Sequence, residues 1–238
     1  GMDRRVDFVH ASQRCIQQFR GLHVTAANPC SEPETVVRCA PLPAAKAELQ
    51  RPLVAHGPIA LVGVSHPVDS SPDLVFPYLR DDPRMFVMQG NYDHSIGNRL
   101  EDCACGYTDP RDNHFAQISY DYTAANTSDH HKDWLRDLPT EFRRTWGGKR
   151  VLCAHGSPRK VNEFMWNSTC PDNFLEWMLE ANSADVLFVT HTGIPWMREL
   201  PGGELVVNVG AIGRPANNGR TSVDYAMVCF DEESAHFE

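Results

Sequence analysis

Short runs of apolar residues recur along this chain, and each is followed by polar or helix-forming sequence. A run of four to six apolar residues bounded by Gly, Asn or Pro is typical of a strand that is buried on both faces. The pattern therefore predicts a mixed α/β fold. We expect buried strands at Ile59–Val64, Met85–Met88, Arg150–Ala154, Val186–Val189 and Leu205–Val207, an earlier strand at Leu22–Ala27 and an alternating strand at Val223–Phe230.

Helical spacing and turn residues fill the segments between these strands. The apolar positions 174, 175, 178 and 179 share one helix face, which is typical of a helix that covers a core. The pairs Gly147-Gly148 and Gly202-Gly203 predict hairpin turns. We expect helices at Glu34–Cys39, Leu74–Leu79, Ile118–Ala125, Asp129–Leu138 and Phe174–Ala181.

The length and net charge of the chain limit which folds it can form and which partners it can bind. The chain has 238 residues, of which 42% are hydrophobic, which suffices for one large domain with a buried core. Residues 1–20 show only a weak pattern, so we expect an N-terminal extension followed by a single domain over residues 21–238. The formal net charge of −9 argues against nucleic-acid binding, but a local pocket can still bind a small phosphorylated molecule.

The expected location is the cytoplasm. No run of eighteen or more apolar residues and no signal-peptide pattern occurs, so we expect no membrane contact. The eight cysteines show no regular spacing and no C-x-x-C pair, which favours free thiols over a disulfide framework. Cys103 and Cys105 flank one alanine, and for them we prefer buried thiols to a redox-active pair. The oligomeric state stays open.

Four of the predicted strands end in loops rich in Gly, Asn and His. In α/β folds the carboxyl ends of parallel strands meet at one edge of the sheet, and ligand sites form there. We therefore expect the four loops to build one metal or phosphate site. They are Gly90-Asn91-Tyr92-Asp93, Ala154-His155-Gly156, Thr190-His191-Thr192 and Asn208-Val209-Gly210.

In this order, the four loops resemble the later motifs of the calcineurin-like metallophosphoesterases, in particular the bacterial small phosphodiesterase-like branch. The resemblance runs from about Ile59 to Phe230, and Arg99–Tyr107 and His155–Glu163 look like that branch most. It implies a four-layer αββα sandwich of two mixed β-sheets. It also implies two metal ions that clamp a phosphate and generate a hydroxide nucleophile.

Carried over to this chain, the resemblance makes Asn91, His155 and His191 the ligands of the second metal. Their imidazole nitrogens and amide oxygen suit a divalent transition metal such as Zn, Mn or Fe. Tyr92 stands where many relatives have a histidine that acts as leaving-group acid, so Tyr92 and Asp93 are weaker catalytic candidates. For Asp93 we prefer the role of a structural hydrogen-bond acceptor.

The ligands of the first metal are missing. The family pattern has Asp-x-His after the first strand, a bridging Asp after the second and a further His in the fifth motif. The corresponding residues are Ala27, Pro29, Val64 and Gly193, so we expect at most one ion. A reading-frame fault near the N-terminus would explain the first three positions but not Gly193, and coordinated loss is the simpler account.

Neighbouring residues offer substitute ligands. His66 and Asp69 follow the second strand, and Asp7 with His10 forms a D-x-x-H pair. Either pair could replace the lost ligands, although we expect all four to be ordinary residues that bind no metal.

Two functions stay open at this point. One is a phosphoesterase of low activity that hydrolyses a small phosphomonoester or phosphodiester at an incomplete dinuclear site. Arg159 and Arg214 are weak candidates for contacts with the substrate phosphate, and a structural role for each is equally expected. The alternative is an inactive family member that binds a ligand or a partner protein. Three neutral ligands leave the charge of an ion uncompensated, which favours this alternative.

Overall fold

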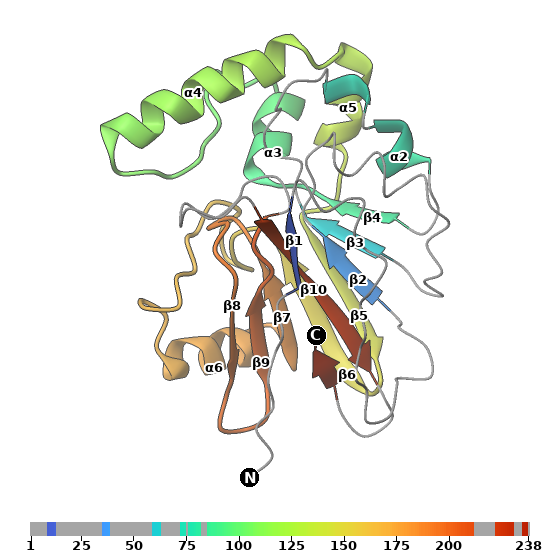
Figure 1. Ribbon diagram of the computed structural model, residues 1–238, viewed down its shortest axis with the longest axis vertical. Coiled ribbons are helices and arrows are strands. Elements are labelled where there is room, and N and C mark those ends of the chain that lie inside the picture. Colours follow the sequence, from blue (N-terminus) through green and yellow to red (C-terminus); the bar gives the residue numbers. More distant parts are fainter. Residues whose placement is uncertain are drawn as a thin grey trace.

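The computed structural model describes residues 9–12, 35–38, 59–62, 72–74, 76–81, 85–211, 222–230 and 235–237. These residues form two β-sheets and a group of helices (Figure 1). The strand predicted at 22–27 lies outside the described residues. None of the helices in the described segments combines the length and the hydrophobicity that a bilayer-spanning helix requires.

The first sheet has six strands and mixes parallel with antiparallel pairs. Three parallel neighbours, β2, β3 and β4, form one side of it, and β4 is the edge strand. The long strand β10 pairs antiparallel with β1, β2 and β11. The bounds are β1 Val9–Ser12, β2 Thr35–Arg38, β3 Ile59–Val62, β4 Met85–Met88, β10 Ser222–Phe230 and β11 Ala235–Phe237.

The second sheet has five strands in the order β5-β6-β7-β9-β8. Its centre is parallel, and each end is an antiparallel hairpin. Gly147 and Gly148 join β5 to β6 with φ angles of 50° and 72°, the left-handed values that a tight hairpin turn needs. The bounds are β5 Glu141–Trp146, β6 Lys149–Ala154, β7 Val186–Val189, β8 Trp196–Glu199 and β9 Leu205–Asn208.

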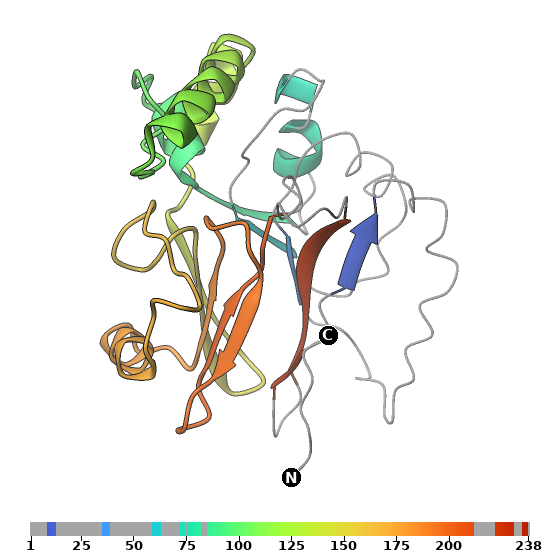
Figure 2. The same cartoon turned by 60° about the vertical axis from the view of Figure 1, so that its left-hand side comes forward.

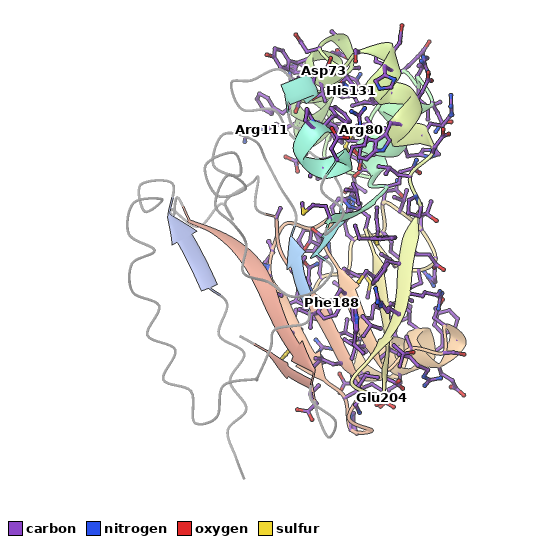
Figure 3. The ribbon with its side chains drawn as sticks, turned by 90° about the vertical axis from the view of Figure 1, so that its right-hand side faces the viewer. Asp73, Arg80, Arg111, His131, Phe188 and Glu204 are labelled. Carbon is purple, nitrogen blue, oxygen red and sulfur yellow. A yellow bond between two sulfur atoms is a disulfide. The ribbon has the colours of Figure 1, made fainter. Side chains whose placement is uncertain are left out.

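The two sheets face each other across a hydrophobic core, and a helix covers the outer face of the second sheet (Figure 2). Strand β7 is buried on both faces because its side chains alternate between these two layers. Phe188 points into the core between the sheets (Figure 3), whereas Leu187 packs against α6, Asp172–Ala181. The fully apolar sequence of β7 follows from this double burial.

A group of helices lies beyond one end of the sheets (Figure 1). Helices α3 and α5 cross closely at Gly97, where an added Cβ would lie 2.5 Å from the backbone nitrogen of Arg136. Asp73 and His131, both labelled in Figure 3, pair at 2.7 Å across this group. The elements are η2 Pro72–Leu74, α2 Phe76–Arg80, α3 Asn91–Gly97, α4 Pro110–Ala125 and α5 Asp129–Arg136.

The predicted α/β class is confirmed, and several elements differ from the prediction. The helix expected at Glu34–Cys39 is wrong, because Val36 and Val37 lie in β2 and pair with β3 and β10. Residues 9–12 of the expected N-terminal extension form β1 in the first sheet. The fourth layer of the predicted αββα sandwich stays a prediction.

Candidate functional site

The three predicted metal ligands follow strands in the two different sheets. Asn91 begins α3 three residues after the end of β4, an edge strand of the first sheet. His155 directly follows β6, and His191 comes two residues after β7. Because β6 and β7 are parallel neighbours, their carboxyl ends lie side by side. The amide from one sheet therefore meets the two imidazoles from the other.

The side chains of these residues are in direct contact. The Nε2 atom of His155 lies 2.9 Å from Oδ1 of Asn91 and 3.1 Å from Nδ1 of His191. Asn91 and His155 are each only 3% exposed, and His191 is half-buried. We call Asn91, His155 and His191 the Asn-His-His cluster. Three atoms that can bind a metal ion thus face one point at the junction of the sheets.

Backbone carbonyls of the segment 103–105 orient two members of the cluster. Nδ2 of Asn91 donates to the Cys103 carbonyl at 2.9 Å, which leaves Oδ1 to face His155. Nε2 of His191 lies 3.0 Å from the Cys105 carbonyl. A carbonyl can only accept, so Nε2 of His191 carries the hydrogen, and Nδ1 is unprotonated in the neutral ring.

The backbone of His191 adopts a conformation that is unusual outside glycine. Its φ angle is 52°, in the left-handed region, which costs about 1–3 kcal/mol for such a residue. The amide of the preceding Thr190 donates to the His155 carbonyl at 2.9 Å and ties the two loops together. Conformations of this kind concentrate at functional sites, where the surrounding structure holds them.

His155 is held in its neutral form. Burial lowers the pKa of His155 well below its usual value of 6.5, and a positive charge on His191 would lower it further. Both neighbours of its Nε2 atom are acceptors, so the hydrogen of the neutral ring lies on Nε2. Its other nitrogen, Nδ1, is buried and has no hydrogen-bond partner within the described part of the chain.

The donor set of the cluster fits one divalent transition metal ion. Two imidazole nitrogens and an amide oxygen are suitable ligands, and a backbone carbonyl behind the outer nitrogen of His191 is the usual support for a metal-bound histidine. To bind an ion through Nε2, His155 must carry its hydrogen on Nδ1. No group of three or more His, Cys, Asp or Glu side chains able to hold a metal occurs among the described residues. The cluster itself gives an ion no negative charge.

Tyr92 and Asp93, the weaker catalytic candidates, support the fold around α3. The Tyr92 hydroxyl donates to the Ala116 carbonyl at 2.9 Å, and its ring packs against Tyr120 in the helical core. Asp93 is 1% exposed and accepts the Gly90 amide at 2.7 Å, which caps the start of α3.

The side chain of Arg159, a phosphate-binding candidate, contacts other side chains at the surface. Its guanidinium forms an ion pair with Glu163 and lies over the rings of Phe174 and Trp177, at 5.3 and 5.9 Å from their centroids. These contacts correspond to the structural role that the sequence allowed. The candidates Arg214, His66 and Asp69 lie outside the described residues.

Of the four positions that the resemblance assigns to ligands of the first metal, the structure describes Gly193. Its φ angle is 69°, and an added Cβ would lie at an ordinary contact distance of 3.8 Å from Ala211. A histidine here would therefore have space but a strained backbone. Ala27, Pro29 and Val64 lie outside the described residues.

The sheet order changes where the first-metal motif is expected. The parallel neighbour of β3 on the side away from β4 is β2, so a first strand placed at β2 would put the motif directly after Arg38. The sequence there is Cys39-Ala40-Pro41, which contains neither Asp nor His. Neither placement of the first strand is followed by an Asp-x-His sequence.

A disulfide joins Cys103 to Cys105 beside the cluster, which sequence reasoning missed. The prediction of free thiols is wrong for this pair: Ala104 takes a φ angle of 47° between them, and their Cα atoms lie 5.2 Å apart. Cys153 and Cys170 are buried free thiols, as predicted. The one-residue spacing of the pair was the available signal.

No family model and no curated protein matches this chain. Solved structures do match. A metallophosphoesterase from Sphaerobacter thermophilus aligns with a TM-score of 0.56 over 86% of each chain, at 20% identity. This chain has the metallophosphoesterase fold. The same fold relates it to a hypothetical protein from Pyrococcus horikoshii, with a TM-score of 0.55 at 20% identity over 76% of this chain and 73% of the other. Vps29 from Chaetomium thermophilum aligns with a TM-score of 0.50 at 12% identity, over 85% and 82% of the two chains.

Proposed function

We propose that this chain is a member of the calcineurin-like family that holds one divalent transition metal ion, Zn, Mn or Fe, at the Asn-His-His cluster. Its proposed activity is hydrolysis of a small phosphomonoester or phosphodiester in the cytoplasm. The observation that carries the proposal is the meeting of Asn91 Oδ1, His155 Nε2 and His191 Nδ1 within hydrogen-bonding distance at the ends of strands from both sheets.

Each member of the cluster has a definite part in this proposal. When bound, the ion would act as a Lewis acid toward a phosphoryl oxygen of the substrate. Asn91 presents its oxygen because the Cys103 carbonyl holds its amide nitrogen. His191 is fixed by the Cys105 carbonyl, and the neutral state of His155 favours metal binding over protonation. Tyr92 and Asp93 are given a supporting part, because their observed contacts stabilise α3.

A specific observation favours the alternative of an inactive, ligand- or partner-binding member. The cluster contains no carboxylate, and Gly193 takes a left-handed backbone conformation where the family pattern has a histidine. A single ion of uncompensated charge binds weakly and lacks half of the phosphate clamp of the two-metal enzymes.

Metal analysis and a phosphodiesterase assay separate the two functions. The purified protein, loaded with Zn or Mn and desalted, should retain at most one equivalent of metal and hydrolyse bis(p-nitrophenyl) phosphate slowly. His155→Ala and His191→Ala should each abolish both properties, because two protein ligands rarely hold a catalytic ion. His130→Ala, at an exposed histidine of α5, is the matched control and should retain both.

The results of these two assays distinguish between errors in the site and errors in the proposed activity. Tight metal binding that survives both cluster variants would refute the site, and loss of metal with His66→Ala would show that a substitute ligand contributes. Metal binding without hydrolysis would favour the inactive alternative.

A further inference from the structure

The Cys103–Cys105 disulfide contacts the Asn-His-His cluster from two sides. The Sγ atom of Cys105 lies 3.3 Å from Nδ2 of Asn91, whose Oδ1 in turn lies 2.9 Å from His155. The carbonyl of Cys105 lies against His191. A sulfur atom is therefore separated from the His155 nitrogen by one side-chain amide group.

This sulfur can supply what the cluster lacks. Asn91 and the two neutral imidazoles give an ion no negative charge, whereas a cysteine thiolate is an anionic ligand that Zn²⁺ and Co²⁺ bind well. In the disulfide both sulfurs are neutral and cannot act in this way. The redox state of the pair therefore determines whether an anionic ligand lies next to the cluster.

The segment stays attached to the site when the disulfide opens. The Ala104 carbonyl accepts from Nδ2 of Asn162 at 2.7 Å, and the Cys103 carbonyl accepts from Nδ2 of Asn91 at 2.9 Å. These bonds do not depend on the disulfide, so they keep Cys105 beside the cluster after reduction. The two sulfurs belong to residues only 6% exposed, but Asp102 and Gly106 next to them are exposed, so a small reductant approaches from that side.

We propose that the Cys103–Cys105 disulfide is a redox gate for the metal centre, and that reduction turns Cys105 into a fourth, anionic ligand of an ion held by the Asn-His-His cluster. A dithiol reductant gives two electrons and two protons to the disulfide and becomes a disulfide itself, leaving two thiols. The Cys105 thiol then loses its proton to solvent as its sulfur binds the ion, and Cys103 stays a thiol. This inference rests on the proposed metal centre.

Reduction should shift the metal preference of the protein as well as its affinity. Thiolate ligands select Zn²⁺ and Co²⁺ over Mn²⁺, which prefers oxygen ligands. The reduced protein should thus bind Zn²⁺ at least about tenfold more tightly than the oxidised protein, the lower bound for loss of an interaction that supports a metal site. Its affinity for Mn²⁺ should change little.

The test is a titration of the full chain with Co²⁺ and Zn²⁺, in the oxidised form and after reduction and anaerobic removal of the reductant. The reduced protein should show thiolate-to-cobalt charge-transfer absorption, and the oxidised protein should not. Two matched variants each lack the disulfide and retain one of its cysteines. Cys103→Ser should show the absorption without any reductant, and Cys105→Ser should never show it.

Each result bears on one of the two proposals. If the two serine variants behave alike, or if the oxidised protein binds Zn²⁺ as tightly as the reduced one, the redox gate is refuted. Equal binding in both states that is lost in His155→Ala would leave the metal centre standing without the gate. If no form binds either metal, both proposals fail.

Discussion

Acidification should destabilise the metal-free protein through a single buried side chain, His155. This residue is 3% exposed, and burial lowers its pKa well below 6.5. In the unfolded chain the same imidazole takes up a proton near pH 6.5. Below that pH the unfolded state therefore holds one more proton than the folded state. The free energy of unfolding then falls by about 1.4 kcal/mol per pH unit until the folded pKa is reached.

The pH range of this effect is separate from that of the carboxylates. The hydrogen bond from Arg150 holds the pKa of Asp185 below its usual value of 3.8, so this carboxyl contributes stability that is lost only in stronger acid. Between about pH 8 and about pH 5, histidines dominate the proton balance. If substitution of His155 changes the slope of unfolding free energy against pH within this range, the change can therefore be assigned to this side chain.

The assay is urea unfolding with a chelator present, at several pH values across this range. His155→Gln keeps a neutral side chain at the position and should lose the contribution of one proton to the slope of free energy against pH. His130→Gln, at an exposed histidine, should keep the wild-type slope. A wild-type slope in His155→Gln would refute the conclusion that the fold holds this imidazole neutral.

Three further substitutions test the packing that positions the site, each by urea unfolding. Gly156→Ala should lower the free energy of unfolding by about 1–3 kcal/mol, because the new Cβ would lie 2.5 Å from the Val161 carbonyl oxygen; wild-type stability would contradict this close approach. Trp196→Phe leaves a buried carbonyl without its 2.8 Å indole hydrogen bond and should cost about 1–3 kcal/mol; no loss would mean that another donor replaces it. Leu175→Ala removes a fully buried side chain between α6 and the second sheet and should cost about 2–5 kcal/mol, and a cost well below this would show that the layer collapses around the cavity.

The sequence predicted strand bounds best where a strand packs against apolar residues on both of its faces. Met85–Met88 and Val186–Val189 have the predicted bounds, because both strands pack against apolar clusters on their two faces, fully for the second and partly for the first. Strand β5 was missed for the opposite reason: its middle residues 143–145 are exposed, and Phe142 and Trp146 stand four residues apart, a spacing that also suits a helix.

The sequence also predicted some features of the site and not others. The resemblance predicted that Asn91, His155 and His191 belong together, and the structure brings them into contact at the junction of the two sheets, not at one edge of a single sheet. The disulfide at Cys103–Cys105 was not predictable from spacing alone, since it depends on the left-handed backbone of Ala104. The polar sequence Gly90–Asp93 predicts a loop, whereas α3 begins at Asn91, and the i, i+4 spacing of Tyr92 and Ile96 is that of a buried helix face.

An ion at the cluster would act as a reversible cross-link between the two sheets. Asn91 and His155 are 64 residues apart in the chain and follow strands of different sheets, and the core cluster between the sheets consists of apolar side chains, whose contacts are non-directional. Occupancy should therefore slow the separation of the sheets more than it slows local opening of α4, which lies outside the cross-linked layers. Hydrogen exchange should show this as stronger protection of β4 and β6 than of α4 when the metal is added.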